Sequence, residues 1–328
     1  MKKHQLFNRA IKSSITQLFS YSVIIFALCA IPVSAQQIPV STIFMENPFS
    51  FNPAVAGSDN MFKVRMNTRM QWLGFGDGPF TAQFSGYGPH RVRNIGYGGS
   101  VLIDKTGAIS MTKANATFAT NFPITTQIRT SFGINFGFLQ MKLDGSQFGD
   151  QMVPGGPIDP RDDKLQPTAM PSFNPDAGVG VFVYHYDWYV GLSAQQLFNN
   201  NVKFTKEGED NKLNRIKTHF YGYGGYKQPL AGNFMLEPAV LFTQVVGMPM
   251  QVDFNVRLVY DQNIWGGLSI RNTFESFDDF SLIFGYIHER SLYVAVAYDF
   301  TFAQIRKFTA GSLELVIGYN FEELRRGR

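Results

Sequence analysis

The sequence predicts an all-β protein: a transmembrane antiparallel up-and-down β-barrel of about fourteen strands, with a short N-terminal periplasmic segment. Three observations predict this class. Of the 328 residues, 15% are aromatic and only 16% are charged, against about 25% charged residues in soluble domains. Apolar and polar residues alternate along many segments, each close to the roughly 9–11 residues that a transmembrane strand needs. After Ala35 no apolar run reaches the roughly 18 residues of a spanning helix.

Residues 1–35 have the three-part layout of a secretory signal peptide. A basic stretch from Met1 to Lys12 precedes an apolar core from Leu18 to Pro32, and small or compact residues end the segment at Ala35. The alternative is an N-terminal membrane anchor. That core is only about 15 residues long and contains polar side chains, so it is short for a spanning helix.

The positive net charge of the chain is confined to this signal segment. Lys2, Lys3, Arg9 and Lys12 are its only charged residues, and removing these four from the 29 basic residues leaves 25, equal to the 25 acidic ones. The balance gives no reason to expect binding to nucleic acid, which requires an excess of basic residues. Cys29 is the only cysteine, so residues 36–328 can form no disulfide, thiolate metal site or cysteine nucleophile.

Residues 36–60 are predicted to form a periplasmic N-terminal segment. It carries several apolar side chains and two Asn-Pro pairs, and asparagine before proline favours an extended or turn backbone over a helix. Because so many apolar side chains are unfavourable in solution, we expect the segment to plug the barrel or to bind a partner. The alternative is a flexible leader. The candidate plug or partner-binding residues are Asn47, Pro48, Phe49, Phe51, Asn52 and Pro53.

Residues 61–321 are predicted to form the barrel. In the first strand apolar residues from Phe62 to Met70 interleave with polar ones from Lys63 to Gln71, and a strand places alternate residues on opposite faces. The predicted strands lie near 61–72, 80–87, 95–104, 111–122, 127–141, 177–185, 187–195, 218–227, 234–245, 250–260, 264–272, 280–287, 292–301 and 312–321.

The lengths of the connections agree with this count. If the first strand runs outward, every periplasmic turn is short, and the two longest connections, 143–176 and 196–217, are extracellular, as in bacterial outer-membrane barrels. Aromatic residues such as Tyr260 and Phe321 end apolar faces, as in an interfacial girdle. A soluble β-sandwich also alternates, but fourteen strands without a disulfide exceed an ordinary sandwich. Residues 322–328 are predicted to be a basic periplasmic tail.

The inward faces of the strands carry a predicted network of lumen charges. Antiparallel pairing of the first and last strands places Arg69 and Glu314 together near the outer end. We favour a salt-bridged interior that fills a narrow barrel and fixes its closure, because unpaired charges would be costly if dry. The alternative is a charged lumen that selects solutes. The predicted network comprises Lys63, Arg65, Arg69, Asp104, Asp253, Arg257, Asp299 and Glu314.

No catalytic residue, metal site or cofactor is predicted. The aspartates of loop 143–176 could bind calcium, but they lack the regular spacing of a calcium loop. The histidines outside the signal segment fall at different levels of the predicted barrel, and no Ser-His-acid set or zinc motif accompanies them. A lipid-hydrolysing barrel therefore has no plausible site, and the chain is predicted not to be an enzyme.

Several segments form recognisable motifs. Near the start these are Asn47-Pro48, Asn52 to Gly57 and Arg69 to Phe75, followed by Gly99 to Gly107. The last hairpin adds Tyr298-Asp299-Phe300-Thr301 and Gly311-Ser312-Leu313-Glu314-Leu315. Together they resemble the PorP/SprF family of outer-membrane proteins of the type IX secretion system. Leu313 departs from the family, which more often has a polar residue there.

The resemblance implies a location in the cell outer membrane and a role in protein secretion or gliding motility. Family members either contact other type IX secretion components at the periplasmic face or retain a secreted adhesin through the C-terminal domain of that adhesin. The surrounding partner would be outer-membrane lipid. The strand pattern alone leaves a passive outer-membrane diffusion porin as the alternative function.

Overall fold

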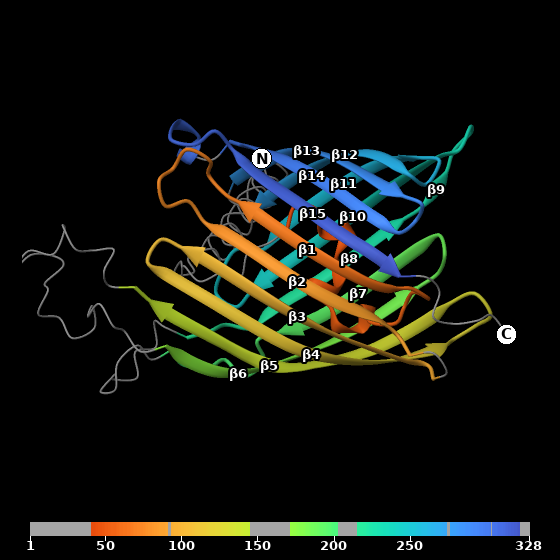
Figure 1. Ribbon diagram of the computed structural model, residues 1–328, viewed down its shortest axis with the longest axis horizontal. Coiled ribbons are helices and arrows are strands. Elements are labelled where there is room, and N and C mark those ends of the chain that lie inside the picture. Colours follow the sequence, from red (N-terminus) through yellow and green to blue (C-terminus); the bar gives the residue numbers. More distant parts are fainter. Residues whose placement is uncertain are drawn as a thin grey trace, which may run out of the picture. The chain divides into compact units, whose positions relative to one another are not determined.

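The computed structural model describes residues 41–90, 93–144, 171–202, 215–273, 276–302 and 304–321 (Figure 1). The chain divides into two compact units, Met1–Ala35 and Gln36–Arg328, and all of the described residues belong to the second. The predicted signal peptide, most of the loop 143–176 and the basic tail lie outside the described residues.

The described residues of the second unit form one closed antiparallel sheet of fourteen long strands, so the predicted up-and-down barrel is confirmed. Each strand pairs with its neighbours in the sequence, and β15 pairs with β1 to close the barrel. The two-residue β9 continues β8 along β10 in the same register. The strands are β1 (Phe62–Met70), β2 (Phe80–Pro89), β3 (Ile95–Thr106), β4 (Ile109–Pro123), β5 (Arg129–Leu143), β6 (Ser172–Tyr184), β7 (Trp188–Gln195), β8 (His219–Tyr226), β9 (Gln228–Pro229), β10 (Phe234–Val245), β11 (Gln251–Tyr260), β12 (Ile264–Thr273), β13 (Ser276–His288), β14 (Leu292–Thr301) and β15 (Ser312–Phe321).

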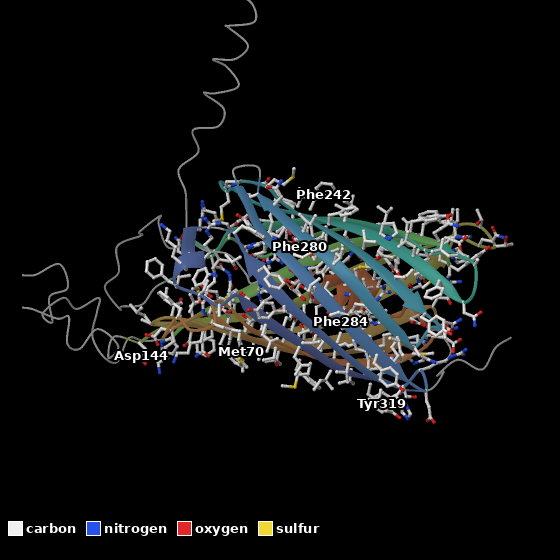
Figure 2. All side chains as sticks on the ribbon, turned by 90° about the horizontal axis from the view of Figure 1, so that it is seen from above. Met70, Asp144, Phe242, Phe280, Phe284 and Tyr319 are labelled. Carbon is white, nitrogen blue, oxygen red and sulfur yellow. The ribbon has the colours of Figure 1, made fainter. Side chains whose placement is uncertain are left out.

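Alternation along each strand separates an outer apolar face from an inner polar one. On β1 the side chains of Arg65 and Arg69 are buried inside the barrel, whereas Met66 is exposed on the outside. Figure 2 shows Phe284 and Tyr319 projecting from the outer face, and Phe284 is 61% exposed. In an outer-membrane barrel this apolar face contacts lipid, which explains the large exposed apolar area.

The barrel has two distinct ends. At the long-loop end lie the connections 144–171 and 196–218, and at the short-turn end the connections such as 185–187 and 261–263 contain only a few residues. Strand β1 begins and β15 finishes at the short-turn end, where Phe62 pairs with Phe321. With the usual arrangement of bacterial barrels, the short turns face the periplasm.

Strand β6 begins earlier than the sequence predicts, at Ser172 instead of 177, and runs through Pro175. Proline cannot donate a ladder hydrogen bond, so it disfavours a central strand. Here β6 pairs with β5 from Ser172 onward but with β7 only from Val179, so Pro175 lies where one edge of β6 has no neighbour. Asp176 is therefore a strand residue and does not belong to the loop.

Residues 41–57, called the plug from here on, lie inside the ring of strands, at the red end of the colour scale (Figure 1). They form three single turns of 3₁₀ helix, η1 (Phe44–Glu46), η2 (Pro48–Ser50) and η3 (Pro53–Val55). Each Asn-Pro pair starts one turn, because proline suits the first helical position. The plug contacts the long-loop end near Ser41 and the short-turn half of the wall near Gly57.

Candidate functional site

The first feature of the lumen is a buried group of charges near the long-loop end, here called the upper charge cluster. The Arg69 guanidinium lies 2.6 Å from an Asp299 oxygen and 3.1 Å from a Glu314 oxygen. On the neighbouring wall, Arg271 lies 2.6 Å from Asp253 and 3.5 Å from Asp279. These charges come from β1, β11, β12, β13, β14 and β15, so the cluster links the strands on both sides of the barrel closure.

Thr42 of the plug is bound at the centre of the upper charge cluster. Its backbone N–H donates to Glu314 Oε2 at 2.8 Å, and its hydroxyl donates to Asp299 Oδ2 at 3.1 Å. Arg69 donates to the same hydroxyl at 2.8 Å, and the Asn255 amide donates to the Thr42 carbonyl at 2.9 Å. Ser41 Oγ also donates to Glu314. Arg271 adds a bond to the Thr42 hydroxyl at 3.4 Å, so the beginning of the plug is tied to β1, β11, β12, β14 and β15.

A second group of charges, the lower charge cluster, lies closer to the short-turn end. The guanidinium of Arg257 is bonded to Glu46 of the plug and, at 2.7 Å and 3.0 Å, to Glu237 of β10. The same guanidinium lies over the ring of Trp265, 5.3 Å from its centroid. Buried charges are tolerated when they are paired and hydrogen-bonded, and this cluster meets both conditions.

Side-chain amides also fix the plug to the wall. The Asn47 amide donates to Asn67 Oδ1 at 3.0 Å and to Ser85 Oγ at 3.1 Å. The Asn52 amide donates to the Val181 carbonyl at 3.1 Å, and its oxygen accepts the N–H of Ala54 at 2.9 Å. Both asparagines are fully buried, so each supplies wall contacts that an apolar residue could not.

Aromatic side chains fill the space around η2. The ring of Phe49 stacks on Tyr87 with centroids 4.4 Å apart, and Phe51 meets Tyr223 edge-on at 5.0 Å. The Phe51 carbonyl accepts the Ser193 hydroxyl at 2.7 Å. Aromatic contacts of this kind add to the apolar area that the plug buries.

Two glycines of the wall allow the plug backbone to come close. A Cβ added at Gly133 would lie 2.3 Å from the backbone nitrogen of Ala54, and one at Gly96 would lie 2.0 Å from the carbonyl oxygen of Ala56. No side chain fits at such distances without displacing η3. The wall sequence is therefore matched to the plug at these two positions.

The eight predicted lumen charges do not form one network. Arg69, Asp253, Asp299 and Glu314 lie in the upper charge cluster, and Arg257 lies in the lower one.

The other three have separate surroundings. Lys63 pairs with Asp59 at 2.6 Å, next to the short-turn end. Arg65 lies over the ring of Tyr293, 5.0 Å from its centroid. Asp104 accepts hydrogen bonds from two threonine hydroxyls and stands apart from the cations.

The residues that pair with lumen charges but were not predicted from the sequence include Glu46, Asp59, Lys113, Asp176, Glu237 and Asp279. Lys113 and Asp176 form a third buried pair, with 2.9 Å between nitrogen and oxygen. Strand alternation places Glu237 and Lys113 on the inner face, so the sequence pattern could have predicted that both side chains point into the lumen. Glu46 lies in an irregular segment, where no periodicity indicates its direction.

A cavity of about 570 Å³ remains between the plug and the wall, called the short-turn cavity from here on. Its lining includes Tyr184 and Tyr189 of the wall and Phe44 of the plug, with Arg129 and Lys227 beside the short turns. Within the described ranges no three His, Cys, Asp or Glu side chains are grouped so as to hold a metal ion. Among the same residues, no helix has the length and apolar character needed to cross a membrane.

The sequence profile described as type IX secretion system membrane protein PorP/SprF matches residues 33–319. The chain belongs to the PorP/SprF family. This PorP/SprF protein is therefore an outer-membrane β-barrel of the type IX secretion system. The family is one of secretion-system membrane barrels and is not a known enzyme family.

One solved structure of another outer-membrane barrel shares the fold. The toluene transporter TbuX of Ralstonia pickettii is 9% identical with a TM-score of 0.51, covering 89% of this chain and 96% of its own. Omp33 of Acinetobacter baumannii is 9% identical with a TM-score of 0.45, covering 80% of this chain and 97% of its own. Comparison with curated protein sequences finds no match. At such identities the likeness concerns the fold alone.

Proposed function

We propose that this PorP/SprF protein is a closed, non-enzymatic barrel that serves type IX secretion by binding. Its partners would be other secretion components at the periplasmic face or a secreted adhesin held through its C-terminal domain. The observation that carries the proposal is the plug, which occupies the lumen and is bonded to the wall near both ends.

Opening the lumen would require breaking many buried contacts together. Thr42 and Glu46 connect the plug to the two charge clusters, and leaving a buried hydrogen-bonding group without its partner costs about 1–3 kcal/mol. Asn47 and Asn52 add buried amide hydrogen bonds between the clusters. A passive diffusion channel needs an open lumen, whereas a barrel that acts by binding at its ends can keep its lumen filled.

The long-loop end supports contact with a secreted partner. The connection after β1 and the connection before β15 are joined there, because Leu73 N–H donates to the Gly311 carbonyl and Ala310 N–H donates to the Leu73 carbonyl, both at 2.7 Å. Phe75 and Phe308 are exposed on these connections. Ordered loops with exposed aromatic side chains are a suitable surface for binding a protein.

The alternative function is passive diffusion, as in a porin. The short-turn cavity enters the barrel from one end, and a fold neighbour of similar length, TbuX, is described as a toluene transporter. A conducting path would require the plug to leave the lumen. Ion conductance therefore separates the two functions.

The test combines conductance with co-purification. The wild-type protein in a planar bilayer should give no steady single-channel current, whereas a variant lacking residues 42–57 should conduct. Tagged wild-type protein from the native cell should co-purify with a type IX secretion component or an adhesin. Steady current from the wild type, together with the absence of both partners, would contradict the proposal.

A further inference from the structure

We propose that the short-turn cavity binds a polypeptide segment of a partner that presents a carboxylate next to an aromatic side chain. This inference rests on the proposed function, because it gives a binding barrel a site and a ligand class. The cavity of about 570 Å³ falls within the roughly 300–1,000 Å³ of typical ligand pockets.

The charges of the lining favour an anion. Five basic and three acidic side chains line the cavity, a formal excess of two positive charges. All three carboxylates are occupied, because Asp59 pairs with Lys63 while Glu46 and Glu237 share Arg257. The positive charges that remain are therefore the ones available to a ligand.

Those remaining cations are Arg65, Arg129 and Lys227. In the described part of the chain none of the three has a carboxylate oxygen within 4 Å, although Lys227 is near enough to Asp59 to help lower the pKa of that carboxyl. Arg65 donates only to neutral oxygens, one of them Asn320 Oδ1 at 2.6 Å. Cations beside a partly enclosed cavity interact more strongly with an anion than cations in open water do. A ligand carboxylate would supply the missing partner.

The position of these cations makes the site reachable from the periplasm. Arg129 opens β5 directly after one short turn, and Lys227 follows β8 at the start of another. Tyr186, in the turn between β6 and β7, also lines the cavity and is 67% exposed. The cations and this aromatic ring therefore lie where a periplasmic polypeptide would enter.

Aromatic rings form the adjoining wall. Phe182 stacks on Tyr184 with centroids 5.2 Å apart and on Tyr223 at 5.8 Å, and Tyr189 lies next to them. A ligand aromatic ring gains from packing against such rings. Phe44 and Pro48 of the plug form the inner side of the cavity. A lipid is a poor occupant, because the cavity lies within the barrel and not on its outer apolar face.

The closing experiment uses the purified full-length protein in detergent and a neutral-dye peptide of six alternating phenylalanine and glutamate residues. A second peptide carries glutamine in place of glutamate. Fluorescence polarisation should show binding of the acidic peptide that weakens with added salt. Arg129→Gln combined with Lys227→Gln should weaken it at least about tenfold, whereas Arg290→Gln, on a short turn outside the cavity, should leave it within about twofold.

Equal binding of the two peptides, or unchanged affinity of the double variant, would overturn the inference. In native cells the double variant should still insert and should lose the co-purifying secretion component. If it keeps that component at the wild-type level, the partner site lies elsewhere and the inference fails, although the proposed function stands. Steady conductance of the wild type without any partner would instead contradict the proposed function, and the peptide titration would still decide the cavity's ligand.

Discussion

The strongest test of the plugged lumen is the replacement of Arg69 by methionine. Arg69 is the one cation within 4 Å of both Asp299 and Glu314 among the described residues, and those carboxylates are 0% and 1% exposed. It also donates to the hydroxyl of Thr42. Arg69→Met keeps a long side chain but leaves two buried carboxylates without their shared partner.

The size of the effect follows from burial. Removing one partner of a buried ion pair costs about 3–5 kcal/mol, because the remaining charge stays desolvated. We therefore expect Arg69→Met to lower the free energy of unfolding by about 3–5 kcal/mol. Adding Asp299→Asn and Glu314→Gln to the same chain removes the stranded charges and should restore a large part of that loss.

Urea unfolding in detergent, followed by the fluorescence of the three tryptophans, measures the change. With a slope of about 1–3 kcal/mol per molar urea, the midpoint should fall by at least about 1 M. The matched control is Lys105→Met, which removes an exposed cation on β3 and should change stability by no more than about 0.5 kcal/mol.

An Arg69→Met midpoint equal to that of Lys105→Met would refute the reasoning. It would mean that water reaches Asp299 and Glu314 freely, as in an open lumen, so that neither carboxylate depends on the guanidinium. The same result would weaken the argument for a closed barrel, because the upper charge cluster would no longer hold the plug.

Three further predictions concern the plug and its neighbours. Gly133→Ala should displace η3, since its methyl group meets the plug backbone, and should produce current in a planar bilayer. Glu46→Gln should lower the free energy of unfolding in urea by about 1.5–3 kcal/mol, because Arg257 loses its plug partner. Burial alone would raise the pKa of the Asp59 carboxyl, but the neighbouring Lys63 ammonium outweighs burial, so the pKa is lowered. Ionised Asp59 therefore stabilises the fold, by under about 1 kcal/mol, and acidification below about pH 4 should remove this stabilisation. The Asp59→Asn variant should lack it at every pH.

Each of these predictions has a control on the same end of the barrel. Gly266→Ala, near the short-turn end of β12, would place its methyl group no closer than 3.7 Å to any neighbour, and current from this variant would show that the bilayer assay does not report the plug. Glu289→Gln removes an exposed carboxylate, so an equal loss from Glu46→Gln and Glu289→Gln would contradict the role of burial. A pH dependence of Asp59→Asn identical to that of the wild type would exclude the Asp59–Lys63 pair as its source.

The barrel itself could be predicted because the alternation of apolar and polar residues that specifies it lies within each strand. A strand at a lipid boundary must alternate, and the last predicted strand, 312–321, has the observed bounds. The departures occur where alternation is weak or interrupted. The beginning of β6 was not predicted because it contains Pro175. A proline is tolerated there because β7 does not pair with this part of β6, and that pairing can be seen only in the folded sheet.

The candidate site could be predicted only in part, because its contacts join segments far apart in the sequence. Arg69 and Glu314 could be paired from the register of the first and last strands, and the structure places them 3.1 Å apart. Nothing local indicates that Thr42 lies between them, or that Glu46 reaches Arg257, because an irregular segment has no period to follow. The sequence indicates only that residues 36–60 are too apolar for free solution.

The plug also bears on how the barrel closes. Thr42 bonds to Arg69 on β1 and to Glu314 on β15, which are the two strands whose pairing completes the ring. A slip of one residue in that pairing would turn every side chain of one strand to the other face and place a charge against lipid. Because the plug bonds to both β1 and β15, the correct pairing register of these strands and the position of the plug in the lumen stabilise each other. The plug therefore adds stability to a ring that β1 and β15 already close by their own pairing, and with the lumen filled, contact with partners takes place at the two ends.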